Sequence, residues 1–218
     1  MVRRLVRTLS ALAVVAGALV LLVVAHQVWG TDVGAGRAQD RVADELREEW
    51  SAPGAPTEPD PGGAFAFLHV PRLGADWTRA VVEGVDPGQL EAGPGHYPGT
   101  AAPGALGNFA VAGHRVGQGS PFLDLDTVQR GDPVVVETAD TWHVYRVTAT
   151  LVVAPTDTWV VAPTPGGPAD GPATGAFLTL TTCHPEFSDR ERLVVHGELE
   201  TSLAKADAPD GPAALRSP

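Results

Sequence analysis

Residues 176–199 read AFLTLTTCHPEFSDRERLVVHGEL, two apolar, β-branched runs joined by a short polar turn. Runs of this composition and length predict two β-strands, at 176–182 and 191–199. The first strand ends at Cys183, the only cysteine in the chain, and the second begins near Arg192. A thiol attacks as its thiolate, and a neighbouring cation stabilises that form. The pair is therefore a candidate nucleophile with an anion-stabilising partner.

Upstream of this stretch, short β-like runs alternate with turns rich in Gly and Pro. The predicted strands are 65–70, 79–84, 108–114, 133–138, 142–153 and 156–161, and single helical turns are expected within 86–100 and 121–128. With the last two strands this makes about eight short strands in the region 64–200, a pattern typical of a small β-barrel or β-sandwich. We expect an all-β domain.

The N-terminus reads as a membrane anchor. The stretch from Leu9 to Ala25 has no charged side chain and only Ser10 as a polar one. A bilayer span needs roughly 20 apolar residues, with tolerance down to about 17. A cleaved signal peptide is the alternative, but the apolar run is longer than a typical signal core and no small-x-small cleavage site follows it. We expect residues 1–30 to form a cytoplasmic basic tip and an uncleaved transmembrane helix.

Flanking residues set the expected orientation. Basic residues Arg3, Arg4 and Arg7 precede the apolar run, and Trp29 follows it at the position of an interfacial aromatic. By the positive-inside rule the N-terminus lies in the cytoplasm and the domain after Trp29 lies outside the cell. The membrane is thus the first expected partner.

Residues 31–63 are predicted to be a polar stalk and a Pro/Gly linker. Val42, Leu46 and Trp50 lie four residues apart, on one face of a possible helix, and the pattern fits either a stalk or a helix packed on the domain. The segment 51–63, SAPGAPTEPDPGG, marks the domain boundary. Residues 201–218 are predicted to be a disordered C-terminal tail.

Charge and composition exclude several function classes. The formal net charge is −11, and because the first seven residues contribute +3 the remainder carries −14. Nothing basic is left to follow a phosphate backbone, so nucleic-acid binding is not expected. A single cysteine forms no intrachain disulfide. No pair of His or Cys residues has ligand-like spacing with a carboxylate, so no metal or other cofactor is expected.

The histidine expected to serve Cys183 is His114, which ends the predicted strand NFAVAGH. Strand ends at the rim of a β-domain bring distant residues to one surface. An imidazole there can transfer protons, and a guanidinium can stabilise an oxyanion. His184 adjoins Cys183, but neighbours on a strand point to opposite faces. Arg190 and Arg115 compete with Arg192 for the cationic role.

At this point three motifs resemble those of the sortase family. TLTTC (179–183) resembles the TLxTC signature, AGHR (112–115) the histidine motif, and the arginine of RLVV (192–195) the catalytic arginine. Their order and spacing agree with the family over residues 64–200, and the membrane anchor agrees as well. CHP after the signature and APTDTW (154–159) are most similar to class E sortases of actinobacteria.

The resemblance implies a closed eight-stranded β-barrel on the outer face of a Gram-positive membrane. It implies a cysteine transpeptidase in which Cys183 attacks the Thr–Gly carbonyl of an LPxTG- or LAxTG-like sorting signal and forms a thioacyl-enzyme. His114 is then the acid and base, and Arg192 stabilises the oxyanion. The implied partners are surface proteins bearing the signal and the amine of a peptidoglycan precursor. Thr182, Tyr97 and His96 are the expected substrate-binding residues.

Three alternatives stay open at this point. The first is a cysteine hydrolase that cleaves surface peptides without transfer. The second is a sortase that polymerises pilins through a lysine, although residues 31–63 contain no compelling lid motif. The third is a surface β-domain that binds a partner, with Cys183 buried in its core as free cysteines often are.

Overall fold

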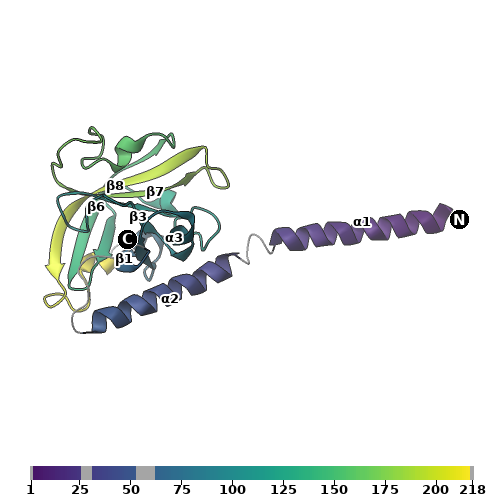
Figure 1. The fold of residues 1–218 in the computed structure, drawn as a ribbon, viewed down its shortest axis with the longest axis horizontal. Coiled ribbons are helices and arrows are strands. Elements are labelled where there is room, and N and C mark those ends of the chain that lie inside the picture. The colour runs from purple at the N-terminus through teal and green to yellow at the C-terminus, as the bar shows by residue number, and fades with distance from the viewer. Residues whose placement is uncertain (1, 26–30, 53–61, 217–218) are drawn as a thin grey trace.

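The computed structural model of the chain describes residues 2–25, 31–52 and 62–216. Trp29, expected at the membrane interface, and most of the predicted linker 51–63 lie outside the described residues. Figure 1 shows the long N-terminal helix α1, the second helix α2 and the β-domain.

The β-domain is a closed eight-stranded barrel, as the resemblance implied, with strand order β1-β2-β3-β4-β7-β8-β6-β5. Two pairs, β2–β3 and β4–β7, are parallel, and the other pairs are antiparallel. The strands are β1 Ala64–His69, β2 Thr78–Glu83, β3 Gly95–His96, β4 Gly107–Ala112, β5 Pro133–Glu137, β6 Thr141–Val153, β7 Ala176–His184 and β8 Glu191–Ala204.

One predicted strand is wrong. The run 156–161 forms the 3-10 helix η4 (Thr158–Val161), and the eighth strand is the two-residue β3 instead. The apolar composition of 156–161 resembled a strand, but the main chain here is held by tertiary hydrogen bonds from the Asn108 amide to the Val160 and Ala162 carbonyls rather than by a sheet partner. The expected helical turns are present as α3 (Pro87–Ala92) and η3 (Leu125–Thr127), and η2 (Pro71–Leu73) follows β1.

The barrel interior is filled by alternate residues of the central strands. Phe109 and Val111 of β4, Leu178 and Leu180 of β7, and Leu193 of β8 belong to one buried cluster. Because successive side chains of a strand point to opposite faces, the residues between them face outward. This alternation of inward and outward side chains decides which polar side chains share the outer surface near the ends of β4, β7 and β8.

Helix α1 (Val2–Ala25) contains the segment Val6–Val23, which is long and apolar enough to cross a bilayer and has no part buried against the rest of the protein. A signal sequence near the N-terminus has the same properties. The sequence-based expectation of an apolar N-terminal helix is confirmed at this level.

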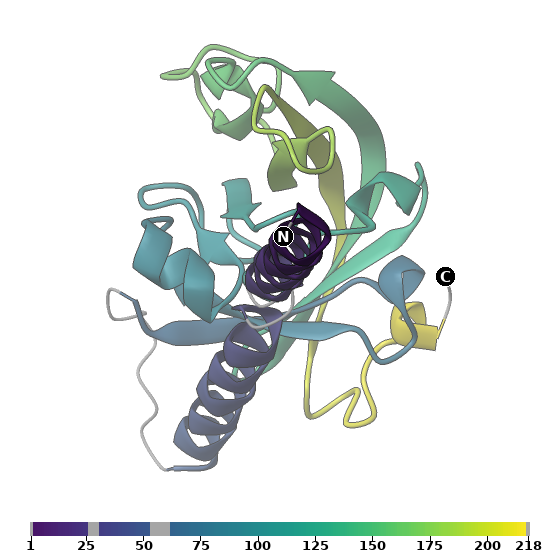
Figure 2. The ribbon, with the colours of Figure 1, turned by 90° about the vertical axis from the view of Figure 1, so that its right-hand side faces the viewer.

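Helix α2 (Thr31–Ser51) packs against the barrel, which decides between the two interpretations of this segment. Figure 2 shows it lying along one side of the domain. Leu46 is 2% exposed, and the Trp50 ring meets Phe67 edge-on at 5.3 Å between centroids. The Gln39 side chain donates to the Ala92 carbonyl and accepts from the Ala80 backbone N–H at 2.5 Å. The helix is therefore attached both to α3 and to strand β2.

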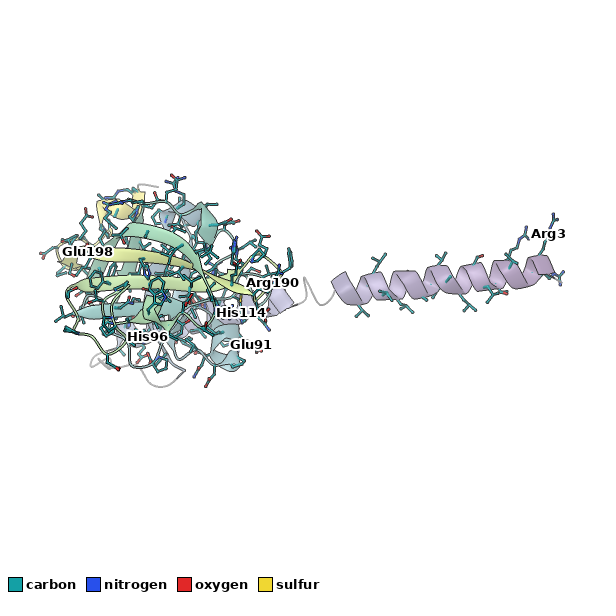
Figure 3. All side chains as sticks on the ribbon, turned by 90° about the horizontal axis from the view of Figure 1, so that it is seen from above. Arg3, Glu91, His96, His114, Arg190 and Glu198 are labelled. Atoms are coloured by element: carbon teal, nitrogen blue, oxygen red, sulfur yellow. The ribbon has the colours of Figure 1, made fainter. Side chains whose placement is uncertain are left out.

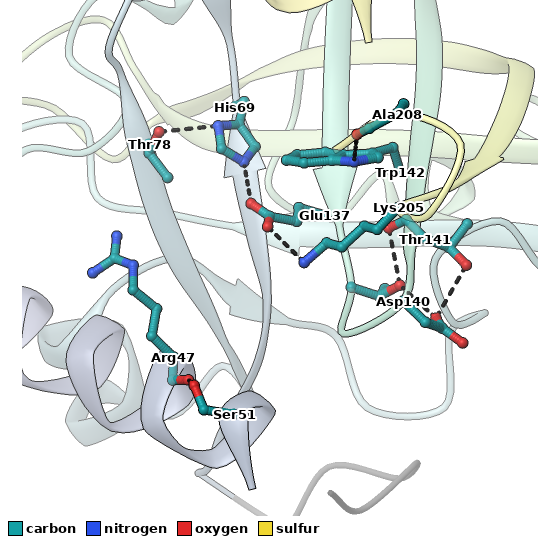
Figure 4. Close-up of polar contacts among 11 residues, drawn as sticks. Arg47, Ser51, His69, Thr78, Glu137, Asp140, Thr141, Trp142, Lys205 and Ala208 are labelled. Atoms are coloured by element: carbon teal, nitrogen blue, oxygen red, sulfur yellow. Dashed lines mark hydrogen bonds and ion pairs between the residues drawn. The ribbon is translucent and has the colours of Figure 1, made fainter. Parts of the chain in front are cut away.

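Residues 201–216 are ordered, which corrects the expectation of a disordered tail for this part of 201–218. Strand β8 continues to Ala204, and η5 (Ala213–Arg216) packs its Ala214 beside the barrel. Lys205 Nζ forms an ion pair with a Glu137 carboxylate oxygen at 2.7 Å (Figure 4). The same Nζ lies 4.2 Å from the Trp50 ring centroid. The Trp142 indole donates to the carbonyl of Ala208 at 3.1 Å. The polar sequence of residues 201–218 gave no indication of these anchoring contacts.

Candidate active site

Cys183 and Arg192 lie directly opposite each other in the antiparallel β7–β8 pair. Residues paired in this way project to the same face, with Cβ atoms about 5 Å apart. Leu180 and Leu193 point into the core, so Cys183 and Arg192 point outward. Cys183 is a free, partly exposed thiol. This does not fit a cysteine buried in the core.

His114 reaches the same face from β4. Strand β4 runs parallel to β7, with Ala112 opposite Thr181. The Gly113 N–H donates to the Thr181 carbonyl at 3.0 Å, so the pairing continues past the last strand residue. Extending this register by two residues sets His114 alongside Cys183. Figure 3 shows His114 and Arg190 at one end of the barrel and Glu198, later in β8, at the other.

The surroundings of His114 favour its neutral form. Burial lowers the pKa of the His114 imidazole below its ordinary value of 6.5, and the negative charge of Glu91 opposes this only in part. A neutral imidazole at neutral pH is able to accept a proton. Glu91 lies on α3, the helix to which Gln39 of α2 is hydrogen bonded.

The three candidate arginines take different places. The Arg192 Nη1 donates to the carbonyls of Asp189 at 2.8 Å and Glu191 at 3.0 Å, which holds the guanidinium at the β7–β8 turn. Arg190 is exposed within the turn. Arg115 is 3% exposed and ion-paired with Asp126 at 3.0 Å. Arg192 is the one of the three that the β7–β8 register pairs with Cys183.

Tyr97 reaches the outer face two residues from the thiol. Its Oη lies 2.9 Å from the Oγ1 of Thr181, and Thr181 shares the outward phase of Cys183 on β7. Sequence reasoning did not single out Thr181. The period of two along TLTTC was the available signal, because it places residues 179, 181 and 183 on one face.

Thr182 and His96 do not project onto this face. Thr182 is 3% exposed, and its Oγ1 donates to the Gly113 carbonyl at 2.8 Å, so it ties β7 to the end of β4. The His96 ring lies 2.6 Å from a Glu83 oxygen and stacks on Phe109, a core residue, at 5.1 Å. Among residues 2–25, 31–52 and 62–216, no group of three His, Cys, Asp or Glu side chains is arranged to hold a metal ion.

The family model of the sortase domain matches residues 68–200, which include His114, Cys183 and Arg192. This chain belongs to the sortase family. The match covers more than half of the chain and nearly the whole barrel.

Two curated relatives of this sortase come from Streptomyces coelicolor. Sortase SrtE1 is 37% identical over 203 residues, which is 88% of this chain and 56% of the relative. Sortase SrtE2 is 34% identical over 209 residues, which is 89% of this chain and 81% of the relative. This chain therefore spans little more than half the length of Sortase SrtE1. The expected relationship to class E sortases is confirmed by both.

Solved structures agree with the barrel of this sortase. The SrtF sortase from Corynebacterium diphtheriae is 35% identical with a TM-score of 0.71, and the similarity covers 77% of this chain and 98% of that one. Sortase E from Streptomyces avermitilis is 39% identical with a TM-score of 0.64, covering 72% and 99%.

A buried polar network fastens η4 of this sortase to the outer face of the barrel. The Asn108 Nδ2 donates to the Val160 and Ala162 carbonyls, at 3.3 and 3.0 Å. Its Oδ1 then accepts the Thr179 hydroxyl proton at 2.8 Å. With that proton committed, His196 Nδ1, 3.0 Å from the same hydroxyl, is the donor. Burial lowers the pKa of His196 to about 4, so the ring is neutral.

This network predicts an acid-labile fold. The folded-state pKa of His196 is about 4 against an ordinary 6.5, so the unfolded chain binds a proton that the folded chain does not. The contribution of His196 to stability is complete above pH 6.5 and falls as the pH approaches 4, by on the order of 3 kcal/mol. In urea unfolding, wild type should lose that much more stability than His196→Gln between pH 7.5 and pH 4. Equal losses in both proteins would contradict the assignment.

Proposed function

We propose that this sortase is a membrane-anchored cysteine transpeptidase that cleaves the Thr–Gly bond of an LPxTG- or LAxTG-like sorting signal. In this proposal it transfers the surface protein to the amine of a cell-wall precursor. The observation that carries the proposal is the shared outer face of Cys183, Arg192 and His114 at the ends of β7, β8 and β4. A nucleophile, a proton carrier and a fixed cation on one open surface are the parts that acyl transfer needs.

The first half-reaction forms a thioester. The Cys183 sulfur attacks the threonine carbonyl carbon, and the carbonyl oxygen becomes an oxyanion. Arg192 has five N–H donors, and the Nη1 group is the one hydrogen bonded to the turn carbonyls. We assign its other N–H groups to the oxyanion or the substrate carbonyls. His114 takes the thiol proton of Cys183 as the sulfur attacks and then gives it to the departing glycine amine. The C–N bond breaks, and the acyl group stays on sulfur.

The second half-reaction returns the enzyme to its starting state. An incoming amine attacks the thioester carbonyl, and His114 takes the proton that the amine loses. The C–S bond breaks and a new amide forms, and the departing Cys183 thiolate takes the proton back from His114, which restores the thiol and the neutral imidazole. The lowered pKa of His114 suits this step, because a neutral imidazole is the form that accepts a proton. Water in place of the amine gives hydrolysis.

The Tyr97–Thr181 pair is the proposed contact for the residues that precede threonine in the signal. It lies on the outward face of β7, one pleat before the nucleophile. The solved structure of Sortase E1 from Streptomyces coelicolor carries a tripeptide in its active site and is 35% identical to this chain, with a TM-score of 0.63. This relative supports a peptide substrate here. In this proposal Thr182 and His96 do not contact the substrate. They affect it only by holding β7, β4 and β3 in place.

The proposed location is the cell membrane, with α1 as a single span. The apolar segment Val6–Val23 supports the span, and the basic residues before it support a cytoplasmic N-terminus. Both the barrel and the site would then work outside the cell, where the sorting signals of exported proteins and the wall precursors meet.

Product analysis tests the proposal. The full chain in detergent micelles is mixed with a peptide containing an LAxTG motif, with and without triglycine, and the products are separated by mass. We expect cleavage between Thr and Gly, with the triglycine amide growing at the expense of the free acid as triglycine increases. Free acid alone at every triglycine concentration would identify a hydrolase, and an intact peptide would refute the proposed reaction.

A further inference from the structure

Arg115 is a buried cation immediately next to the proposed catalytic histidine. Its side chain is 3% exposed. A guanidinium keeps its charge at all physiological pH values, and a buried charge is tolerated only when it is paired and hydrogen bonded. The sequence left Arg115 as a competitor of Arg192, and its burial away from the outer face gives it a different role.

The partners of Arg115 come from two other segments around the site. Its Nε donates to the Leu123 carbonyl at 2.9 Å, and its Nη2 lies 3.0 Å from Asp126 and 3.6 Å from Glu186. Its Nη1 donates to His184 Nδ1 at 3.3 Å. One side chain thus joins the start of the His114 loop to residues 123–126 and to the turn that follows Cys183.

The contact with His184 completes a frame around the catalytic pair. On one side, the Gly113 N–H bonds the Thr181 carbonyl and the Thr182 hydroxyl bonds the Gly113 carbonyl. On the other side, Arg115 bonds His184. In the extended β4–β7 register, His114 and Cys183 are the positions between these two links.

Gly113 shows how closely this frame is packed. A Cβ placed on Gly113 would lie 2.6 Å from the Phe122 ring, and Phe122 N–H donates to the His114 carbonyl at 3.1 Å. The main chain on both sides of His114 is therefore held close to Phe122, by packing at Gly113 and by a hydrogen bond at His114. The Arg115 link is the part of the frame that also carries charge.

We propose that Arg115 is a positioning residue that locks His114 against Cys183 and neutralises the Asp126 and Glu186 carboxylates beside the pair. The proposal rests on the function proposed above. Because an arginine only donates, His184 Nδ1 must accept, and His184 is neutral in this arrangement. The guanidinium reaches Leu123, Asp126 and His184 in separate directions at once. A lysine ammonium keeps the charge but not this planar fork.

Two variants separate geometry from charge. Arg115→Lys keeps a cation without the fork, and Arg115→Met removes both. Arg72→Met is the matched control, because Arg72 makes a two-pronged ion pair, at 2.8 and 2.7 Å, with Asp132, a partner that Arg115 does not use. All are measured as the full chain in micelles, with rates expressed per folded molecule from circular dichroism.

We expect kcat to fall about 100-fold in both Arg115 variants, with KM for the peptide within about threefold, because small misplacements of reacting groups are costly. The alkylation rate of Cys183 with iodoacetamide, followed against pH, should rise at higher pH in Arg115→Met than in wild type. It should stay near wild type in Arg115→Lys, because the ammonium still neutralises Asp126 and Glu186, whereas the unpaired carboxylates left in Arg115→Met disfavour the thiolate. Arg72→Met should keep kcat within about threefold and an unchanged alkylation profile.

A kcat per folded molecule in Arg115→Met within about threefold of wild type, with an unchanged alkylation profile, would overturn the inference and leave a purely structural arginine. Peptide turnover that survives Cys183→Ala would instead overturn the proposed function. The two failures are distinguishable, because the first requires an active, Cys183-dependent wild type.

Discussion

Replacing Cys183 by alanine is expected to lower kcat/KM for an LAxTG peptide by at least about 10⁴-fold, the usual cost of losing a catalytic nucleophile. The sulfur is the atom that forms the thioester, and the sequence contains no second cysteine to replace it. The unfolding free energy should change by less than about 1 kcal/mol, because the side chain is partly exposed and outside the core.

Measurements of peptide cleavage and of urea unfolding on the same preparations check this expectation. A Cys183→Ala variant that loses activity and stability together would favour a structural thiol. A variant that keeps its activity would remove the cysteine from the reaction.

Replacing His114 by alanine is expected to lower kcat by about 10²–10⁴-fold, the range typical of a lost general acid and base. His143 provides a matched control. Its pKa is also lowered by burial, and its Nδ1 is hydrogen bonded to Ser202 at 2.9 Å on the β6–β8 side of the barrel. His143→Ala should keep kcat within about threefold. Equal losses in the two variants would mean that His114 supports the fold and takes no part in proton transfer.

The pairing of Cys183 with Arg192 was predictable because two β-like runs joined by a short turn form a hairpin whose register sets partners opposite each other. The closed barrel came from the resemblance, since the strand pattern alone fitted a sandwich equally well. The place of His114 could be anticipated only as a strand end. Its position alongside Cys183 depends on the parallel β4–β7 register, and contacts between strands about 70 residues apart leave no local signal.

The features that were missed depend on tertiary contacts. Strand β3 has two residues, and Gly95 is required there because a Cβ would lie 2.1 Å from the Gly84 carbonyl. No periodicity marks so short a strand. The placement of Arg115 follows from Asp126 and Glu186, which pair with it from other segments. Sequence spacing does not indicate such partners.

The most direct test of the central claim is the mass of the enzyme during the reaction. The full chain in micelles is mixed with an LAxTG peptide, quenched in acid within seconds, and analysed intact and after proteolysis. We predict a mass increase equal to the acyl fragment that ends in threonine, located on Cys183, released by triglycine and missing in Cys183→Ala. An active enzyme with no such adduct, or with the adduct on another residue, would contradict a thioacyl-enzyme at Cys183.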